Sequence, residues 1–168
     1  MIVAPGHPFR LVKMNLVCHP MSALPPHPTS AEWNHFLLEV LAEFQCVTGT
    51  LHRLDPADNL LKLVACERIP EVLLPVIQTI PVGKGVAGAA AQRKAPVEIC
   101  NLQTDTTGVA KPDAKKTQVQ GSLAVPILDA AGEVHGTLGI GKMEPYDFSE
   151  TEKNRLLEIG TEIAGRLG

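Results

Sequence analysis

The sequence predicts an α+β fold built around a mainly antiparallel sheet. Apolar residues recur at helical spacing near residue 33 and again near residue 156, so a helix is expected at each end of the folded region. Between them stand short runs rich in β-branched residues, separated by turn residues. The clearest is "SLAVPILDAAGEVHGTLGI", residues 122–140, where alternating apolar positions flank a turn. Consecutive strands joined by such turns pair antiparallel, which gives the predicted sheet.

The first helix is expected to begin after the proline of "PTSAEW". Thr29 caps the helix in this prediction, and Glu32, three residues later, completes a capping box. One apolar stripe then follows at helical spacing: Trp33, Phe36, Leu37, Val40, Leu41 and Phe44. Six of the 14 prolines fall within residues 1–28. We therefore interpret residues 1–27 as a proline-rich arm and residues 28–168 as one domain.

The middle of the chain predicts strands, a crossover and a long loop. "CVTGTLHRL" and "LLKLVAC", joined by "DPADN", are expected to form a hairpin, and residues 71–78 a short helix that contains Pro75. "VAGAAAQRK" is typical of a crossover helix and "VEIC" of a short strand. Residues 101–120 are polar and show neither period, which indicates a lid, a binding loop or a disordered segment. Its lysines are candidates for contact with an anionic ligand: Lys111, Lys115 and Lys116.

The closing elements are the hairpin of residues 122–140 and a final helix. On the second strand of the hairpin, Val134, Leu138 and Ile140 are expected to pack on the terminal helices, with His135 and Thr137 on the opposite face. A second capping box, Ser149 with Glu152, begins the final helix. Its apolar stripe is Leu156, Ile159, Gly160, Ile163 and Leu167.

Composition indicates one soluble globular domain. The 168 residues are 45% hydrophobic and 20% charged, with a formal net charge of -3. This balance provides no basic surface for nucleic acid or an anionic membrane, and no segment reaches the roughly 20 apolar residues of a membrane helix. The cysteines are too widely spaced for a zinc pattern, and we interpret them as reduced thiols in a cytoplasm: Cys18, Cys46, Cys66 and Cys100.

Residues 83–88 read G-x-G-x-x-G, the pattern of a dinucleotide-binding loop. That function requires the glycines to leave the first strand of a parallel βαβ unit, with an acidic residue about 20 positions further on. Here the motif follows a weak strand in mid-chain, and Asp105, at a suitable distance, falls in the polar loop. We therefore expect Gly83 and Gly85 to supply positive φ in a turn, and Gly88 to let a helix approach the sheet closely.

Several stretches together resemble the GAF domain family. "TIPVGKGVAGAAAQRKAPVEICNL" resembles its glycine turn, alanine-rich helix and following strand, and "SLAVPILDAAGEVHGTLGIGK" resembles its Val-Pro hairpin. "TGTLHRLDPADNLLKLVA" is similar to its first hairpin and "YDFSETEKNRLLEIG" to its closing helix. The resemblance implies a central antiparallel sheet with the terminal helices on one face. On the other face it implies a ligand pocket under the crossover helix and the long loop.

The resemblance leaves several functions open, because GAF domains bind cyclic nucleotides, bilins, haem or small metabolites, and one branch reduces free methionine-R-sulfoxide. The reductases have a cysteine directly after the glycine turn, where this chain has Ala87. Bilin attachment needs a cysteine in a context that this chain lacks. Haem would need His52 or His135 as its axial ligand.

The cyclic-nucleotide branch carries an Asn-Lys-Phe-Asp-Glu signature that this chain matches only in part. The corresponding positions hold Gly141, Lys142, Phe148, Glu152 and Lys153. Lys142 and Glu152 are candidates for an ion pair that ties the last strand to the final helix.

The residues expected to bind a ligand are Cys100, Asn101, Ser122, His135 and Thr137. Cys100 is interpreted as a buried thiol, with a redox-sensitive thiol as the alternative, and Asn101 as a turn former. Cys46 and Cys66 are assigned to the core. The sequence shows no nucleophile beside a partnered base, so we assign no catalytic residue, metal ligand or cofactor.

The sequence thus predicts a cytoplasmic sensory or regulatory domain that binds a small molecule. The alternatives are a methionine-sulfoxide-reductase-like enzyme and a dimerising module with an empty pocket. A homodimer through the terminal helices is expected, with exposed apolar surface from Trp33, Leu37, Leu157 and Leu167. Because the chain ends just after the closing helix, its signal is expected to pass to a separate protein.

Overall fold

The computed structural model describes residues 24–109 and 112–167. Most of the predicted arm, residues 1–23, lies outside this part, as does Lys111. The remaining chain forms a six-stranded antiparallel sheet in the order β3-β2-β1-β6-β5-β4. The strands are β1 (Thr48–Asp55), β2 (Leu60–Glu67), β3 (Thr79–Pro81), β4 (Val97–Ile99), β5 (Ser122–Leu128) and β6 (Val134–Gly141).

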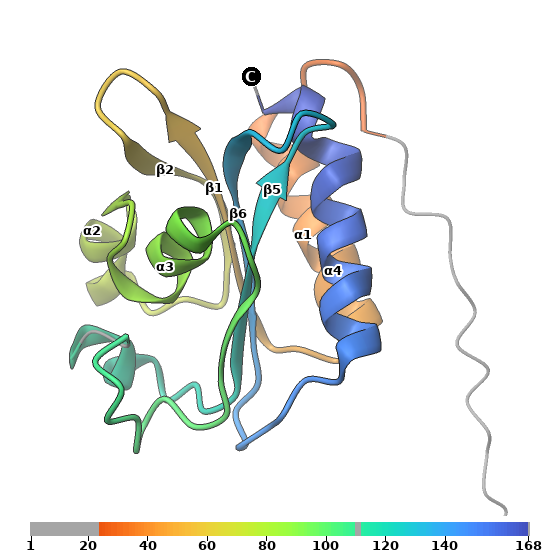
Figure 1. Ribbon diagram of the computed structural model, residues 1–168. Helices are drawn as coiled ribbons and strands as arrows, with labels where there is room; N and C mark the ends of the chain where they lie inside the picture. Colours follow the sequence, from red (N-terminus) through yellow and green to blue (C-terminus); the bar gives the residue numbers. More distant parts are fainter. Residues whose placement is uncertain (1–23, 110–111, 168) are drawn as a thin grey trace, which may run out of the picture.

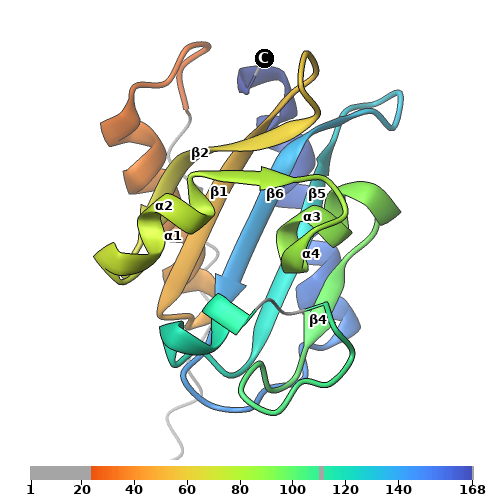
Figure 2. The same cartoon turned by 90° about the vertical axis from the view of Figure 1, so that its left-hand side faces the viewer.

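Helices cover both faces of the sheet. One face carries α1 (Ser30–Phe44) and α4 (Glu150–Ile163), which is extended by a 3-10 turn, η3 (Ala164–Arg166). The other carries α2 (Leu74–Ile77), α3 (Gly85–Arg93) and the long loop (Figure 1, Figure 2). Two further 3-10 turns, η1 (Glu71–Leu73) and η2 (Pro112–Thr117), lie on that side. This arrangement confirms the predicted α+β class and its two-sided sheet.

Both terminal helices begin at the predicted capping boxes. The Thr29 hydroxyl accepts from the Glu32 amide at 3.3 Å, and the Glu32 carboxylate accepts from the Thr29 amide at 2.7 Å. Ser149 and Glu152 repeat this exchange at the start of α4. Each box satisfies amides that an uncapped helix would leave without a partner.

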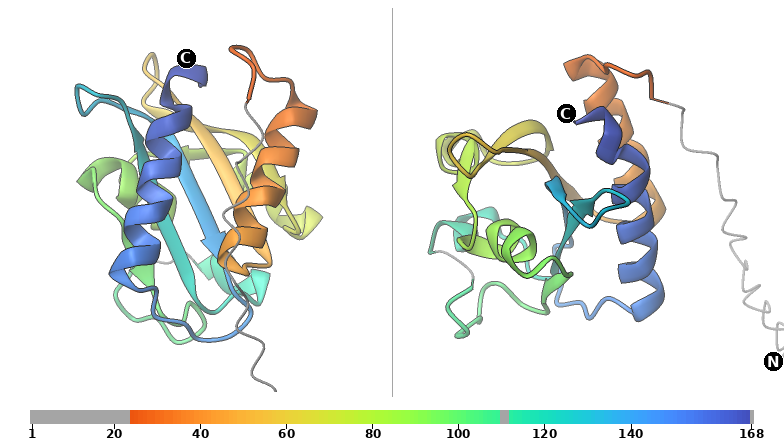
Figure 3. Two further views of the ribbon diagram at one scale, coloured as in Figure 1. Left: turned by 90° about the vertical axis from the view of Figure 1, so that its right-hand side faces the viewer. Right: turned by 45° about the horizontal axis from the view of Figure 1, so that its top comes forward.

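The main core lies between α1, α4 and the sheet (Figure 3). All six apolar positions predicted for α1 are buried there, as are Leu138 and Ile140 of β6. This burial corrects the expected dimer surface: Trp33, Leu37 and Leu167 are buried inside the domain, and Leu157 is half-buried against the same core. The apolar stripes of these amphipathic helices pack against the protein's own sheet.

Lys142 corrects a second expectation. Its ammonium group donates to the carbonyl oxygens of Phe44 at 2.8 Å and Gln45 at 3.1 Å, at the C-terminus of α1. The same group lies 4.4 Å from the centre of the Tyr146 ring, and the Tyr146 hydroxyl donates to Glu152 at 3.0 Å. A direct Lys142–Glu152 pair is not among the ion pairs of the described residues. The cation instead meets the negative end of the α1 dipole.

The glycine stretch behaves as expected from its sequence context. Gly83 has φ of 86° and Gly85 of 65°, and a Cβ at Gly88 would lie 2.5 Å from the carbonyl oxygen of Pro81. β3, just before this turn, is a three-residue edge strand paired antiparallel with β2. The parallel βαβ unit of a dinucleotide fold is therefore absent at these residues.

Candidate functional site

A pocket of about 180 Å³ lies between the sheet and the helices α2 and α3. Its floor is made by β1, β6 and β5, which place small side chains side by side in two cross-strand rows. The first row is Thr48, Gly141 and Ser122, and the second is Thr50, Gly139 and Ala124. The space exists because none of these side chains is large enough to fill it.

Strand alternation fixes which residues face the pocket. A Cβ at Gly49 would lie 3.0 Å from the side chains of both Leu37 and Leu41, so position 49 faces α1. Thr48 and Thr50, on either side of it, face the opposite way into the pocket. β1 and β6 pair without a register shift, so the same face of β6 carries Gly139 and Gly141.

The roof of the pocket is apolar. Residues on and around η1, α2 and β3 supply branched side chains: Ile69, Leu73, Val76, Ile77 and Ile80. Leu102 and Val119 close the pocket from the long loop, where η2 lies against η1. The first turn of α3 adds Gly85, Val86 and Ala87. Such a lining favours an apolar molecule.

Polar groups in the lining are few. The hydroxyl groups of Thr48, Thr50 and Ser122 lie on the floor, and Thr117 lies on the loop side. Lys84, which is exposed, is the one charged residue among the described residues that line the pocket. Among residues 24–109 and 112–167, no cysteine, histidine, aspartate or glutamate belongs to this lining, so these residues bring no thiolate nucleophile and no carboxylate or imidazole base to it.

A third cross-strand row lies on the same face of the sheet, just beyond the pocket. It consists of His52, Thr137 and Pro126, and His52 and Thr137 are each 1% exposed. His52 Nε2 lies 2.8 Å from the carbonyl oxygen of Ile77. Burial lowers the pKa of His52, and the bond to Ile77 opposes this change.

The structure brings the predicted site residues together only in part. Ser122 lines the pocket, and Thr137 lies on the pocket face one row further along. His135 lies near the hairpin turn, half-exposed, with Nε2 2.9 Å from the Asp129 carboxylate. This hydrogen bond holds the pKa of Asp129 below its usual value. The Nε2 atoms of both histidines considered for haem, His52 and His135, therefore have protein partners.

Cys100 and Asn101 stand outside the lining. The prediction that Cys100 is buried is wrong, because β4 ends at buried Ile99 and the next residue turns outward beside Asp147. A hydrogen bond to Asp147 raises the pKa of the Cys100 thiol, which reduces its thiolate fraction. Asn101 forms the predicted turn, accepting at 3.0 Å from the amide of Gln103. Contact of these residues with a ligand stays a prediction.

Sequence reasoning missed most of the floor. Thr48 and Thr50 stand in "TGT" and Gly139 and Gly141 in "GIG", two patterns that place small residues at alternate strand positions. Alternation of small residues on neighbouring strands was the available signal. It indicates a hollow only once the pairing of β1 with β6 is known.

Comparisons with known proteins agree with this architecture. A GAF domain family model matches residues 31–166, and a search of curated proteins gives no match. The GAF domain of a phosphoenolpyruvate-protein phosphotransferase from Coxiella burnetii superposes with a TM-score of 0.70 at 17% identity, over 82% of this chain and 81% of that one. The corresponding Acinetobacter domain gives 0.67 at 17%, over 82% and 80%.

An enzyme also shares the fold. Free methionine-R-sulfoxide reductase from Neisseria meningitidis, solved with its substrate, gives a TM-score of 0.67 at 19% identity, over 82% of this chain and 77% of that one. At these identities the similarity shows the fold and leaves the activity undefined.

Proposed function

We propose that this chain, which belongs to the GAF domain family, is a sensory or regulatory domain whose signal is a small molecule bound between the sheet and the helices α2 and α3. The pocket supports this proposal most directly. Its floor is kept clear by small residues on three adjacent strands, and its roof is a set of branched apolar side chains. A fold that needed only stability would fill this space.

The size of the pocket favours a compact ligand. A cavity of about 150 Å³ lined by apolar side chains is enough to bind benzene, so a pocket of about 180 Å³ suits a molecule of one ring or a short branched chain. Haem and bilins, with four pyrrole rings, are far larger. The proposed ligand is therefore a small metabolite, in preference to a tetrapyrrole.

The charges argue against a cyclic nucleotide. A buried phosphate needs cations or several donors around it, and the described lining supplies one exposed lysine, Lys84. Lys142, the lysine of the partial signature, has its ammonium group on the carbonyls of Phe44 and Gln45. The ligand that fits best is mainly apolar and uncharged in its buried part.

The pocket also favours binding over sulfoxide reduction. Reduction of a sulfoxide by this fold needs an attacking thiolate beside the substrate. None of the cysteines in the described part of the chain lines the pocket, and Cys100 lies outside it with its thiol beside Asp147. We therefore propose no reductase activity.

Two features of the described residues bear on the location of the protein in the cell. Within residues 24–109 and 112–167, no helix has the length and apolar character needed to cross a bilayer. Cys46, Cys66 and Cys100 are free thiols. These features support a cytoplasmic location, where a liganded domain would act on a separate protein.

Native mass spectrometry of the freshly purified protein, with an absorption spectrum of the same sample, tests this function. We expect a small, colourless, stoichiometric mass excess in the wild type. In Ala87→Phe the new ring occupies the pocket, because Ala87 lines it from the first turn of α3, and the excess should disappear. Ala31→Phe, in the exposed first turn of α1, is the matched control and should retain it. Equal loss or equal retention in both variants contradicts the proposed pocket.

A further inference from the structure

In the described part of the chain, two buried side-chain polar atoms lack a hydrogen-bond partner, and they belong to directly opposed residues. The atoms are Nδ1 of His52 and Oγ1 of Thr137. The residues face each other across β1 and β6, and both side chains are 1% exposed. Buried polar atoms without a partner are rare in folded proteins, so each of these two atoms calls for a hydrogen-bonding group beside it.

The pair stands beside the pocket, on the same face of the sheet as its floor. His52 and Thr137 follow Thr50 and Gly139 on the same face of the sheet, one row beyond the pocket floor. Ile77 connects the two regions, because its residue lines the pocket while its carbonyl oxygen holds His52 Nε2 at 2.8 Å.

The partner of His52 fixes what the ring can offer. A carbonyl oxygen only accepts, so Nε2 carries the proton and donates to Ile77. Burial favours the neutral imidazole. Nδ1 therefore presents a lone pair that requires a donor, and the Thr137 hydroxyl can then donate or accept.

These requirements select a neutral group that carries a hydrogen-bond donor, and a hydroxyl is the smallest such group. The occupant must donate to Nδ1 and exchange a hydrogen bond with a hydroxyl, all in an apolar surrounding. A hydroxyl group meets both conditions without bringing a charge. A carboxylate or phosphate would face the Nδ1 lone pair with no donor to offer, and a carbonyl could pair only with Thr137.

We propose that His52 and Thr137 form a hydroxyl-binding subsite beside the pocket, filled by water in the empty protein and by the hydroxyl of a small, neutral, mainly apolar ligand in the bound protein. The proposed binding of a ligand hydroxyl rests on the proposed function, whereas the proposed water does not.

The roof above the subsite is suited to admit such a group. α2 has four residues, none of them buried, and its last residue is Ile77. A rotation of the Ile77 side chain would join the subsite to the pocket, while the Ile77 carbonyl oxygen keeps its hydrogen bond with His52 and the rows of Thr48 and Thr50 stay in place on the sheet.

A high-resolution crystal structure of the ligand-free full chain tests the water. We expect a density peak at hydrogen-bonding distance, roughly 2.6 to 3.2 Å, from both His52 Nδ1 and Thr137 Oγ1. A dry site, or a direct bond between the two side chains, overturns the proposal. This result does not depend on whether a ligand is ever found.

Cyclohexanol and cyclohexanone test the ligand hydroxyl, because they match in size and only the alcohol donates a hydrogen bond. In NMR titrations of the wild type we expect the alcohol to bind about tenfold more tightly. In Thr137→Val, which keeps the shape and removes the hydroxyl, the ratio should rise, because the ketone loses its only partner while the alcohol still donates to His52 Nδ1. Thr161→Val, whose hydroxyl lies on the exposed face of α4, is the matched control and should keep the wild-type ratio.

The outcomes separate the two proposals. Equal binding of both probes by the wild type overturns the hydroxyl subsite as a ligand site while leaving the pocket function intact. If neither probe binds, the result counts against both the proposed function and the proposed binding of a ligand hydroxyl. The proposed water is then tested by the crystal structure alone. The wild-type measurements stand even if Thr137→Val fails to fold.

Discussion

Gly136 marks the tightest backbone approach among the described glycines. A Cβ at this position would lie 2.0 Å from the carbonyl oxygen of His52 on the neighbouring strand. The strands must separate to admit it, so Gly136→Ala should lower the free energy of unfolding by about 3 kcal/mol in urea denaturation. Gly165→Ala is the control, because no atom lies within 4 Å of its Cβ position. It should change stability by less than about 0.5 kcal/mol, and equal effects would contradict the close approach.

The buried imidazole of His52 predicts a pH dependence. Burial lowers the pKa of His52 below its ordinary value of 6.5. As the pH falls through this value the unfolded chain takes up a proton that the folded protein does not, so stability is full above it and declines below it. The slope contributed by His52 reaches at most about 1.4 kcal/mol per pH unit.

His52→Gln isolates this contribution, because glutamine keeps a donor for the Ile77 carbonyl and does not titrate. Denaturation curves of both proteins between about pH 5 and about pH 8 would measure it. The wild type should lose more stability than the variant on acidification. Parallel pH profiles would mean that the ring gains its proton as easily in the folded protein as in the unfolded chain.

Single residues also show why the site was harder to predict than the fold. Polar and reactive side chains are the ones that a sequence marks as candidates for a site, and of the five residues predicted to bind a ligand Ser122 lies in the lining. The pocket floor is instead made of small residues such as Gly139 and Gly141, and their alignment becomes visible only when Thr50 and Thr48 are placed opposite them. Cys100 is exposed and lies beside Asp147, nearly 50 positions away, and no local pattern carries that information.

Whole elements were predictable where their signals are local. The boxes of Thr29 with Glu32 and Ser149 with Glu152 specify both helix starts within four residues. The hairpins follow from alternation and turn residues in the same way. The direction of Lys142 was not predictable, because its carbonyl partners lie almost 100 residues earlier at the end of α1.

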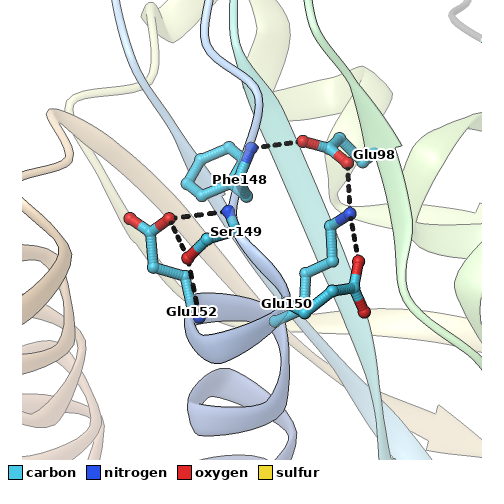
Figure 4. A network of polar contacts seen from close by, with 6 residues as sticks. Glu98, Phe148, Ser149, Glu150 and Glu152 are labelled. Atoms are coloured by element: carbon cyan, nitrogen blue, oxygen red, sulfur yellow. Dashed lines mark hydrogen bonds and ion pairs between the residues drawn. The ribbon is translucent and has the colours of Figure 1, made fainter.

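A carboxylate joins β4 to the start of α4 (Figure 4). Glu98 on β4 accepts hydrogen bonds from the amide of Phe148 and, at 2.7 Å, from the ammonium group of Lys153. Lys153 also pairs with Glu150 at 3.1 Å, but that carboxylate is exposed. β4 has only three residues and pairs with one strand. The contacts of Glu98 therefore help to hold β4 against the start of α4.

Glu98→Ala should therefore lower the free energy of unfolding by about 1 to 2 kcal/mol, because it leaves the Phe148 amide and Lys153 without their acceptor. Glu98→Gln keeps an acceptor for the amide and should recover part of the loss. Glu150→Ala, which removes only the exposed partner, should cost less than about 0.5 kcal/mol. Chemical denaturation of the three variants checks this order, and an equal loss in Glu98→Ala and Glu150→Ala would contradict it.

At the scale of the molecule, the sheet separates a core packed with large side chains on one face from the pocket on the other. Its helix face holds Leu51, Leu123, Val125, Leu138 and Ile140 in the core. Its pocket face carries threonine, serine, alanine and glycine at the facing positions of the same strands. Stability is therefore concentrated on one side, and the other side tolerates a hollow and a thinly packed roof.

The outer surface of the helix layer bears on self-association. The large apolar residues predicted for a dimer are buried or half-buried, which leaves Leu38, 45% exposed, as the large exposed apolar side chain of α1. Ala31 and Ala42 are exposed seven residues before it and four after it, so all three share one stripe. The corresponding surface of α4 carries Glu158 and Glu162. A two-fold contact is therefore expected to pair α1 with α1 of a second copy.

We predict a homodimer through this stripe on α1. Because the apolar patch is small, its dissociation constant should lie above about 1 μM in sedimentation equilibrium. Leu38→Glu places a charge at the centre of the contact and should give a monomer at every concentration. Asn154→Glu adds the same charge to the exposed face of α4 and should leave association unchanged, since that helix lies outside the contact. If the wild type stays monomeric, the surface formed by α1 and α4 is not an interface. If Asn154→Glu disrupts the dimer, the contact lies on α4.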